Sequence, residues 1–184
     1  MSPASFPRLL ARPVHLFVIV ALCAAMVLAA AINPGRAQAQ TATQASTGRQ
    51  IAVAMLALLN RERAAHRLVP VTMSAALIRS AYGHNVSMAH ANTMSHQLRG
   101  EAFFGNRISA TGYKWRSAGE NVAWNSQETG PGATFLQLAM YNEVAPNNGH
   151  RLNILSKNFR NAGISVYFDN VNRKMWITQD FGQH

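Results

Sequence analysis

Cysteine is almost absent from this chain: 184 residues contain only Cys23, which lies in an apolar stretch near the N-terminus. Beyond that stretch the chain can form no disulfide, no cysteine-ligated zinc site and no thiol nucleophile. A domain of this length can instead be stabilised by the burial of a hydrophobic core.

Acidic residues are also scarce, with 7 Asp and Glu against 17 Lys and Arg, which gives a formal net charge of +10. This excess favours contact with anionic surfaces such as lipid head groups or acidic cell-wall polymers. The arginines are scattered and no nucleic-acid-binding motif accompanies them, so we expect no nucleic-acid partner and interpret most of them as solvated.

The N-terminal residues have the features of an export signal. Arg8 and Arg12 precede an apolar run over 16–28, and Ala37-Gln38-Ala39 matches the small-x-small pattern that precedes signal-peptidase cleavage. We therefore predict a secreted or periplasmic protein that is cleaved after Ala39.

Cleavage there divides the chain into a signal peptide over 1–39, a flexible polar lead-in over 40–48 and one domain over 49–184. After cleavage we expect no membrane span. The alternative is retention of the run over 16–32 as an anchor, because it approaches spanning length.

The spacing of apolar residues predicts four helices, which begin near Arg49, Ser74, Ala102 and Pro131. The last quarter of the chain is different, because two β-rich runs over 163–168 and 174–181 flank a polar turn and predict an antiparallel hairpin. Residues 119–124 are a further candidate strand. The pattern as a whole predicts an α+β domain with helices packed on a small sheet.

Four polar side chains in weakly charged surroundings are candidate site residues: His96, Glu120, Glu143 and His150. Imidazoles and carboxylates suit zinc and related divalent ions, and the same groups could hold a proton-shuttling water. Their spacing is wide and no His-Glu-x-x-His motif is present. Spacing alone favours a structural role, in which the four cap helices and satisfy buried backbone groups.

Other histidines have more structural positions. His84 lies on the apolar stripe of the second predicted helix with Leu77 and Met88, which is typical of a buried, hydrogen-bonded histidine. His66 and His90 lie near helix ends, where a positive charge complements the helix dipole.

A series of motifs occurs in a fixed order along the chain. It comprises Leu58-Leu59-Asn60-x-Glu62-Arg63, Ala81-x-x-His84-x-x-x-Met88-Ala89, Ser95-His96, Arg107-Ile108-x-Ala110-x-Gly112-Tyr113-x-Trp115, Gly119-Glu120-Asn121-Val122-Ala123, Gly149-His150-Arg151-x-Asn153-Ile154-Leu155 and Trp176-x-Thr178-Gln179-Asp180-Phe181-Gly182. The series resembles the CAP superfamily (cysteine-rich secretory proteins, antigen 5 and pathogenesis-related proteins class 1) in its bacterial SCP-like form. The resemblance covers nearly all of the chain after the signal peptide.

The resemblance implies a three-layer α-β-α sandwich with a small antiparallel sheet and a central cleft. In that cleft, two histidines and two glutamates of the family can hold zinc or another divalent cation. By motif these are His96, Glu120, Glu143 and His150, although Met140 stands where the family usually has an aromatic residue three positions before the second glutamate. As cleft-supporting residues we predict His84, Asn121, Arg151 and Asn153.

For function, the resemblance favours a binding module over an enzyme, with a divalent metal, a lipid or sterol, or an anionic cell-envelope surface as ligand. The alternative is a metal-dependent hydrolase with a glutamate as base. Four protein ligands on one metal argue against the hydrolase, because catalytic zinc usually keeps one position open for water. A third possibility is a structural or interaction domain with an inert cleft.

Overall fold

The computed structural model describes residues 34–184, and the predicted signal peptide falls mainly on residues 1–33, outside the described part. The elements follow one another as α1 (Pro34–Ala65), β1 (Thr72–Met73), α2 (Ala75–Ala91), α3 (Phe104–Ala110), β2 (Ser117–Asn125), α4 (Gly130–Tyr141), α5 (Gly149–Ile154), β3 (Asn161–Asp169) and β4 (Lys174–Gln183). Within residues 34–184, no helix is both long and apolar enough to cross a membrane.

One sheet of four strands forms the middle of the domain, in the order β1-β3-β4-β2. The predicted hairpin is confirmed, because β3 and β4 pair antiparallel over their whole length, and β2 pairs antiparallel with the other side of β4. The sheet is mixed, whereas the sequence predicts a small antiparallel sheet, because β1 joins the edge of β3 in parallel through Thr72 and Met73. Two residues are too few for a strand period to be visible in the sequence.

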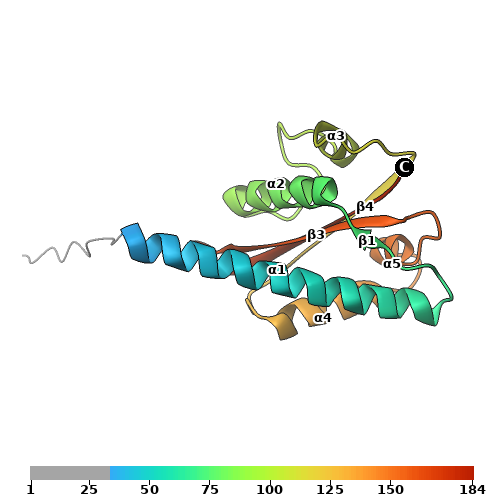
Figure 1. Cartoon of the computed structure of the whole chain (residues 1–184), viewed down its shortest axis with the longest axis horizontal. Coiled ribbons are helices and arrows are strands. Elements are labelled where there is room, and N and C mark those ends of the chain that lie inside the picture. The colour runs from blue at the N-terminus through green and yellow to red at the C-terminus, as the bar shows by residue number, and fades with distance from the viewer. Residues whose placement is uncertain (1–33) are drawn as a thin grey trace, which may run out of the picture. The chain divides into compact units, whose positions relative to one another are not determined.

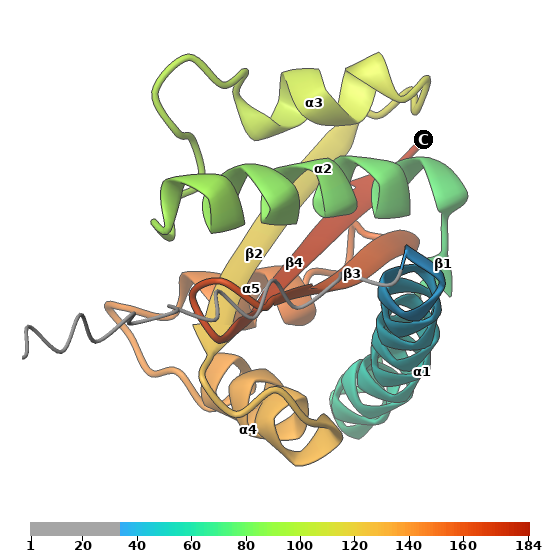
Figure 2. The same ribbon diagram turned by 90° about the vertical axis from the view of Figure 1, so that its left-hand side faces the viewer.

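Helices cover both faces of the sheet, which confirms the predicted three-layer α+β sandwich (Figures 1 and 2). α2 and α3 lie over one face, and α1 and α4 lie over the other. Because successive strand residues point to opposite faces, Ile177 packs with α1 residues such as Leu59, while Trp176 packs with Met88 of α2. The two buried clusters hold the helical layers on the sheet.

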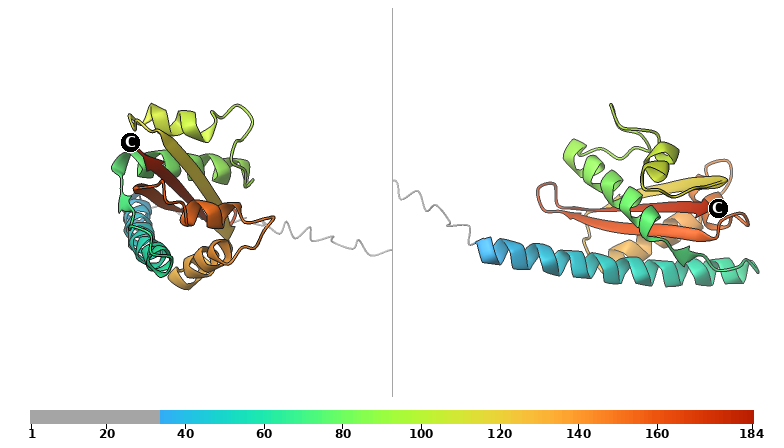
Figure 3. Two further views of the ribbon diagram at one scale, coloured as in Figure 1. Left: turned by 90° about the vertical axis from the view of Figure 1, so that its right-hand side faces the viewer. Right: turned by 45° about the horizontal axis from the view of Figure 1, so that its top comes forward.

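The first helix is longer than the sequence predicts. Residues 40–48, predicted as a flexible lead-in, belong to α1, whose first turns run beyond the β3–β4 hairpin (Figure 3). Pro34 is compatible with the first turn of a helix, and the Ala and Gln residues that follow are good helix formers. The segment has no apolar period, so periodicity alone gave no sign of it. At Gly48 the helix comes close to the sheet, because a Cβ there would lie 3.0 Å from the carbonyl oxygen of Val166.

Candidate functional site

The site is built around the edge strand β2, where neighbouring residues of the Gly-Glu-Asn motif point to opposite faces of the sheet. Glu120 contacts the α2–α3 layer through His96 and Arg107. Asn121 contacts the opposite layer, where its amide donates to the carbonyl oxygen of His150 at 3.3 Å. The two adjacent side chains therefore connect the two helical layers at one edge of the sheet.

Glu120 forms the first pair, with His96. The ring nitrogen His96 Nδ1 lies 2.9 Å from Glu120 Oε1, and the guanidinium of Arg107 forms a salt bridge with Glu120 Oε2. The Glu120 side chain is 1 % exposed, whereas that of His96 is 54 % exposed. Arg107 therefore compensates a carboxylate that water scarcely reaches, while the imidazole stays accessible.

Glu143 forms the second pair, with His150. Its Oε1 contacts His150 Nδ1, and its Oε2 accepts hydrogen bonds from the backbone N–H groups of His150 at 3.0 Å and Arg151 at 3.4 Å. These N–H groups belong to the first turn of α5, which has no earlier carbonyl to pair with them. Glu143 thus caps a helix and orients the histidine at the start of that helix.

The two pairs meet, with 6.5 Å between the ring centroids of His96 and His150. In each pair Nδ1 faces a carboxylate, so Nδ1 carries the proton and Nε2 of the neutral ring keeps its lone pair. No hydrogen bond is found at Nε2 of either ring within the described part of the chain. The fold therefore gathers the four predicted ligand residues as two pairs and leaves one free nitrogen in each.

These residues fit a divalent cation only in part. Across residues 34–184, no group of three His, Cys, Asp or Glu side chains is arranged to hold a metal ion. Both carboxylates are already occupied by donors: Glu120 by His96 and Arg107, and Glu143 by His150 and two backbone amides. The donor set fits a site with two imidazole ligands and water, and it does not fit a cage of four side chains.

His84 positions the loop that carries His96. It is fully buried, and its Nε2 donates to the carbonyl oxygen of Ser95 at 2.8 Å, one residue before His96. Its other nitrogen, Nδ1, lies 2.9 Å from Glu101 Oε1. His84 is thus the buried, hydrogen-bonded histidine that the apolar stripe predicts. It supports the site through the backbone of Ser95, the residue before His96.

Sequence reasoning missed Glu101, although it is one of only seven acidic residues and follows a glycine in a loop. Burial alone would raise its pKa. The hydrogen bonds from His84 and the Leu98 backbone, together with the positive charge of Arg107, outweigh burial and lower the pKa below its ordinary value. Glu101 is therefore ionised, and it links His84 to Arg107, which lies 3.5 Å from its Oε2.

Asp180 was also missed as a site residue. It lies opposite Glu120 in the β2–β4 register, is fully buried, and has no hydrogen-bond partner at either carboxylate oxygen among the described residues. Burial, and then the neighbouring Glu120, raise the pKa of Asp180 well above its usual value. Among the described residues, Arg107 forms its salt bridges with Glu120 and Glu101 and none with Asp180.

The asparagines of the two glycine-bearing motifs join β2 to α5. Asn153 donates to the carbonyl oxygen of Glu120 at 3.1 Å and to Asn121 Oδ1 at 2.9 Å. This close approach explains Gly119, because a Cβ there would lie 2.7 Å from Asn153 Oδ1. Arg151 lies over the ring of Tyr141, 4.6 Å from its centroid. The three predicted supporting residues on these motifs therefore contact the elements that carry the site.

An apolar recess of about 240 Å³ adjoins the second pair. His150 and Glu143 line it together with Met94, Val122, Trp124, Leu136 and Met140. A ligand of the two imidazoles would therefore meet a mainly apolar wall on this side, with Glu143 as its one acidic residue.

Comparison with known proteins agrees with this fold. The model of the cysteine-rich secretory protein family (CAP) matches residues 56–181. Among solved structures, an extracellular protein containing an SCP domain from Bacillus anthracis is similar, with a TM-score of 0.61 and 27 % identity over 76 % of this chain. The match spans 41 % of the Bacillus protein, less than half of its length.

Two further structures share the fold at lower identity. An outer surface protein of Borrelia burgdorferi has a TM-score of 0.62 and 14 % identity, with 73 % of this chain and 93 % of that chain covered. A cysteine-rich secretory protein of Staphylococcus aureus has a TM-score of 0.54 and 15 % identity, with 74 % and 39 % covered. No curated protein matches the chain significantly.

Proposed function

Because this chain belongs to the CAP (cysteine-rich secretory protein) family, we propose that it is an exported binding module whose two histidines, His96 and His150, together hold one divalent cation. The observation that carries the proposal is the matched arrangement of the two imidazoles. Each ring donates Nδ1–H to its own carboxylate and keeps Nε2 free, and the rings lie 6.5 Å apart. Export is supported by the leader pattern and by similarity to an extracellular Bacillus protein.

The carboxylates have an orienting role in this proposal. Histidines that bind metals usually donate their other ring N–H to a carboxylate, which fixes the tautomer and makes the ligand nitrogen more basic. Glu120 and Glu143 have this position, so the four predicted ligands divide into two ligands and two orienting groups. With only two protein ligands, water completes the coordination shell, and binding is weaker and more exchangeable than at a structural zinc site with four ligands.

The hydrolase alternative has less geometric support. A general base needs an oxygen that can reach a water beside the substrate. Glu120 is held by Arg107 and His96, and Glu143 by the start of α5. The predicted lipid, sterol or envelope partner rests on the net charge and the family resemblance, and no residue of the two pairs adds to it.

Calorimetric titration of the purified protein with Zn²⁺ at neutral pH tests the proposal. We expect one weakly bound ion per chain, and loss of binding in His96→Ala and in His150→Ala. His90→Ala is the matched control, because His90 is an exposed histidine in the last turn of α2. Equal zinc binding by the wild type and by the His96→Ala/His150→Ala double variant would refute the proposal.

A second variant separates an orienting group from a ligand. Glu143→Gln keeps a hydrogen-bond acceptor beside His150 but removes the charge, and loss of such a partner typically lowers metal affinity by about 10–100-fold. We expect a reduction in that range with the stoichiometry unchanged. Complete loss of the ion in Glu143→Gln would instead make Glu143 a ligand.

A further inference from the structure

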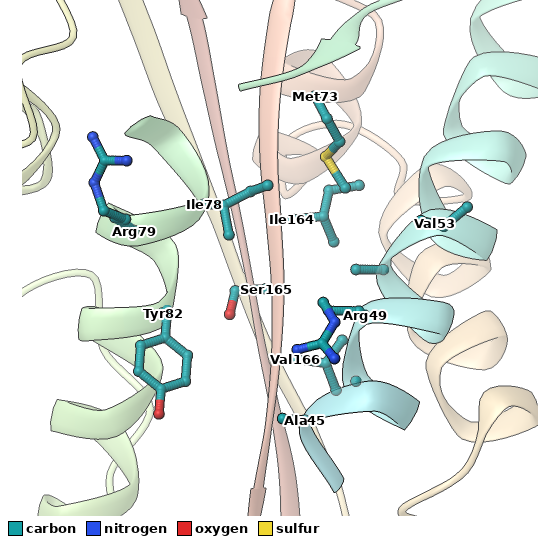
Figure 4. Close-up of a pocket in the computed structure, with 12 residues that line it drawn as sticks. Ala45, Arg49, Val53, Met73, Ile78, Arg79, Tyr82, Ile164, Ser165 and Val166 are labelled. Carbon is teal, nitrogen blue, oxygen red and sulfur yellow. The ribbon is translucent and has the colours of Figure 1, made fainter. Parts of the chain in front are cut away.

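Two sides of α1 differ in polarity. On the side of α2, the helix borders a groove of about 660 Å³ that is lined mainly by apolar side chains such as Val53, Ile78 and Ile164 (Figure 4). On the side of α4, it carries Glu62, which is 6 % exposed and accepts a hydrogen bond from Gln137 of α4 at 2.7 Å. Glutamate is seldom buried unless its oxygens have partners, so the partners of Glu62 define its role.

Glu62 is the last acceptor in a chain of buried side-chain amides. Gln137 Nε2 donates to Glu62 Oε2, and Gln137 Oε1 accepts from Gln179 Nε2 of β4 at 2.6 Å. Gln179 Oε1 accepts in turn from Asn121 Nδ2 at 3.1 Å, within a register pair of β4 and β2. All three amide side chains belong to fully buried residues. We call Gln137, Gln179 and Asn121 the amide chain, and it links α1 to β2 through the core.

The other end of the amide chain lies at the cation site. The amide of Asn121 also donates to the carbonyl oxygen of His150 at 3.3 Å, and Asn121 Oδ1 accepts from Asn153 at 2.9 Å. His150 and Asn153 belong to α5, the short helix that presents the His150 ring. Asn121 therefore holds α5 against β2, and its own amide is oriented in part by Gln179.

All hydrogen bonds along the amide chain point the same way, from α5 toward Glu62. A side-chain amide donates through its nitrogen and accepts through its oxygen. If one amide turned over, N–H groups would face N–H groups on one side and oxygens would face oxygens on the other. Both ends select the same direction, because the carbonyl oxygen of His150 and Oε2 of Glu62 are acceptors. The three amides thus have one arrangement in which their bonds are made.

We propose that Glu62 is a positioning residue of the cation site and acts on His150 through the amide chain. The effect on zinc rests on the function proposed above, whereas the link from Glu62 to α5 exists without a metal. Loss of Glu62 leaves a buried donor of Gln137 without an acceptor, which destabilises the arrangement that holds Asn121 on α5. His150 is then less constrained, and a cation must order it on binding.

Calorimetric titration with Zn²⁺ at neutral pH compares three variants of α1. Glu62→Leu removes the acceptor and should weaken zinc binding about 2–30-fold, as is typical for changes along a coupled network. Glu62→Gln keeps an acceptor oxygen without the charge and should bind zinc as the wild type does. Leu59→Ala, at a fully buried position three residues earlier, removes only packing and should leave the affinity unchanged.

The competing explanation is a direct effect of charge. Arg151, the residue after His150, lies close enough to Glu62 for the two charges to interact. If Glu62 acted in this way, Glu62→Gln would lose as much zinc affinity as Glu62→Leu, because both variants remove the charge. Equal losses in these two variants would therefore overturn the proposal.

A double-mutant cycle tests the route through Gln137. Gln137→Leu interrupts the amide chain next to Glu62 and should weaken zinc binding about as much as Glu62→Leu does. Because both substitutions break the same connection, the double variant should bind zinc no more weakly than either single variant. Losses that add in the double variant would show two separate routes and refute the role of the amide chain.

Nuclear magnetic resonance of the metal-free protein separates this inference from the cation site. The side-chain amide resonances of Asn121 and the ring resonances of His150 should shift in Glu62→Leu and stay near their wild-type positions in Glu62→Gln and in Leu59→Ala. If these shifts occur but the wild type binds no zinc, the cation site is refuted and the link from Glu62 to α5 stands. If the wild type binds zinc but Glu62→Leu changes neither the resonances nor the affinity, the positioning role is refuted. Urea denaturation of each variant checks that the fold is intact.

Discussion

The two His–Glu pairs have the same residue types but different physical support. Glu120 of β2 is 1 % exposed and depends on Arg107, a cation from α3. Glu143 is 23 % exposed and depends on backbone N–H groups of α5, seven and eight residues further along the chain. Burying a charge without a partner costs far more free energy than leaving one near water. Two carboxylates that look equivalent in the sequence should therefore respond very differently to mutation.

Removal of Arg107 is expected to have the largest effect. In Arg107→Ala the carboxylate of Glu120 stays buried beside Asp180 without its guanidinium. Breaking a buried ion pair on one side typically costs about 3–5 kcal/mol of the free energy of unfolding. Urea denaturation at pH 7 measures this loss.

The matched control for that measurement is Arg116→Ala, which removes an exposed arginine immediately before β2. Its expected cost is below about 0.5 kcal/mol, as is usual for surface positions. Similar costs for the two variants would mean that water solvates Glu120 in place of Arg107, and the contrast with Glu143 would then disappear.

Glu62 extends the comparison to a buried carboxylate that forms no salt bridge with any described residue. Glu62 lies on α1, where its Oε2 accepts a hydrogen bond from Gln137 at 2.7 Å and its Oε1 has no partner among the described residues. The adjacent Arg63 does not pair with it, because Arg63 donates to backbone carbonyls such as that of Ile154. Burial, only partly opposed by Gln137, raises the pKa of Glu62 from 4.5 to about 7. The folded state therefore binds this proton more tightly than the unfolded state does.

The pH dependence of stability follows from that shift. The contribution of Glu62 is fully present below the unfolded pKa, declines as the pH rises from about 4.5 to about 7, and is lost above that. Glu62→Gln should abolish this decline. We expect similar stabilities for the variant and the wild type at pH 4.5, and a gain of about 1–3 kcal/mol for the variant at pH 8. Parallel stability profiles of the two proteins in urea between pH 4.5 and 8 would contradict this.

The sequence predicts the parts of this molecule that depend on local pattern. The β3–β4 hairpin and the buried position of His84 follow from periodicity, and the ordered motifs indicate which four residues gather at the site. The different contacts of the two carboxylates among these four residues could not be predicted. They depend on Arg107 reaching Glu120 from α3, and on the register that places Asp180 opposite Glu120. Such contacts between distant segments leave no periodic signal in the chain.

The smallest effect on stability is expected at Glu143. Glu143→Ala removes the acceptor for two N–H groups at the start of α5 and one contact with His150. Because this end of the helix is partly exposed, water can replace the lost acceptor. The expected cost is therefore that of a helix cap, about 1 kcal/mol in the free energy of unfolding.

The stability of Glu143→Ala in urea should therefore lie closer to that of Arg116→Ala than to that of Arg107→Ala. Zinc affinity should fall nevertheless, because the ring of His150 loses the carboxylate that fixes its tautomer and orientation. A loss of 3 kcal/mol or more, estimated as for a buried ion pair broken on one side, would show that Glu143 is as dependent on its partners as Glu120. A small loss of stability together with weaker zinc binding would instead show that the Glu120 pair supports the fold, whereas the Glu143 pair mainly tunes the affinity of the proposed cation site.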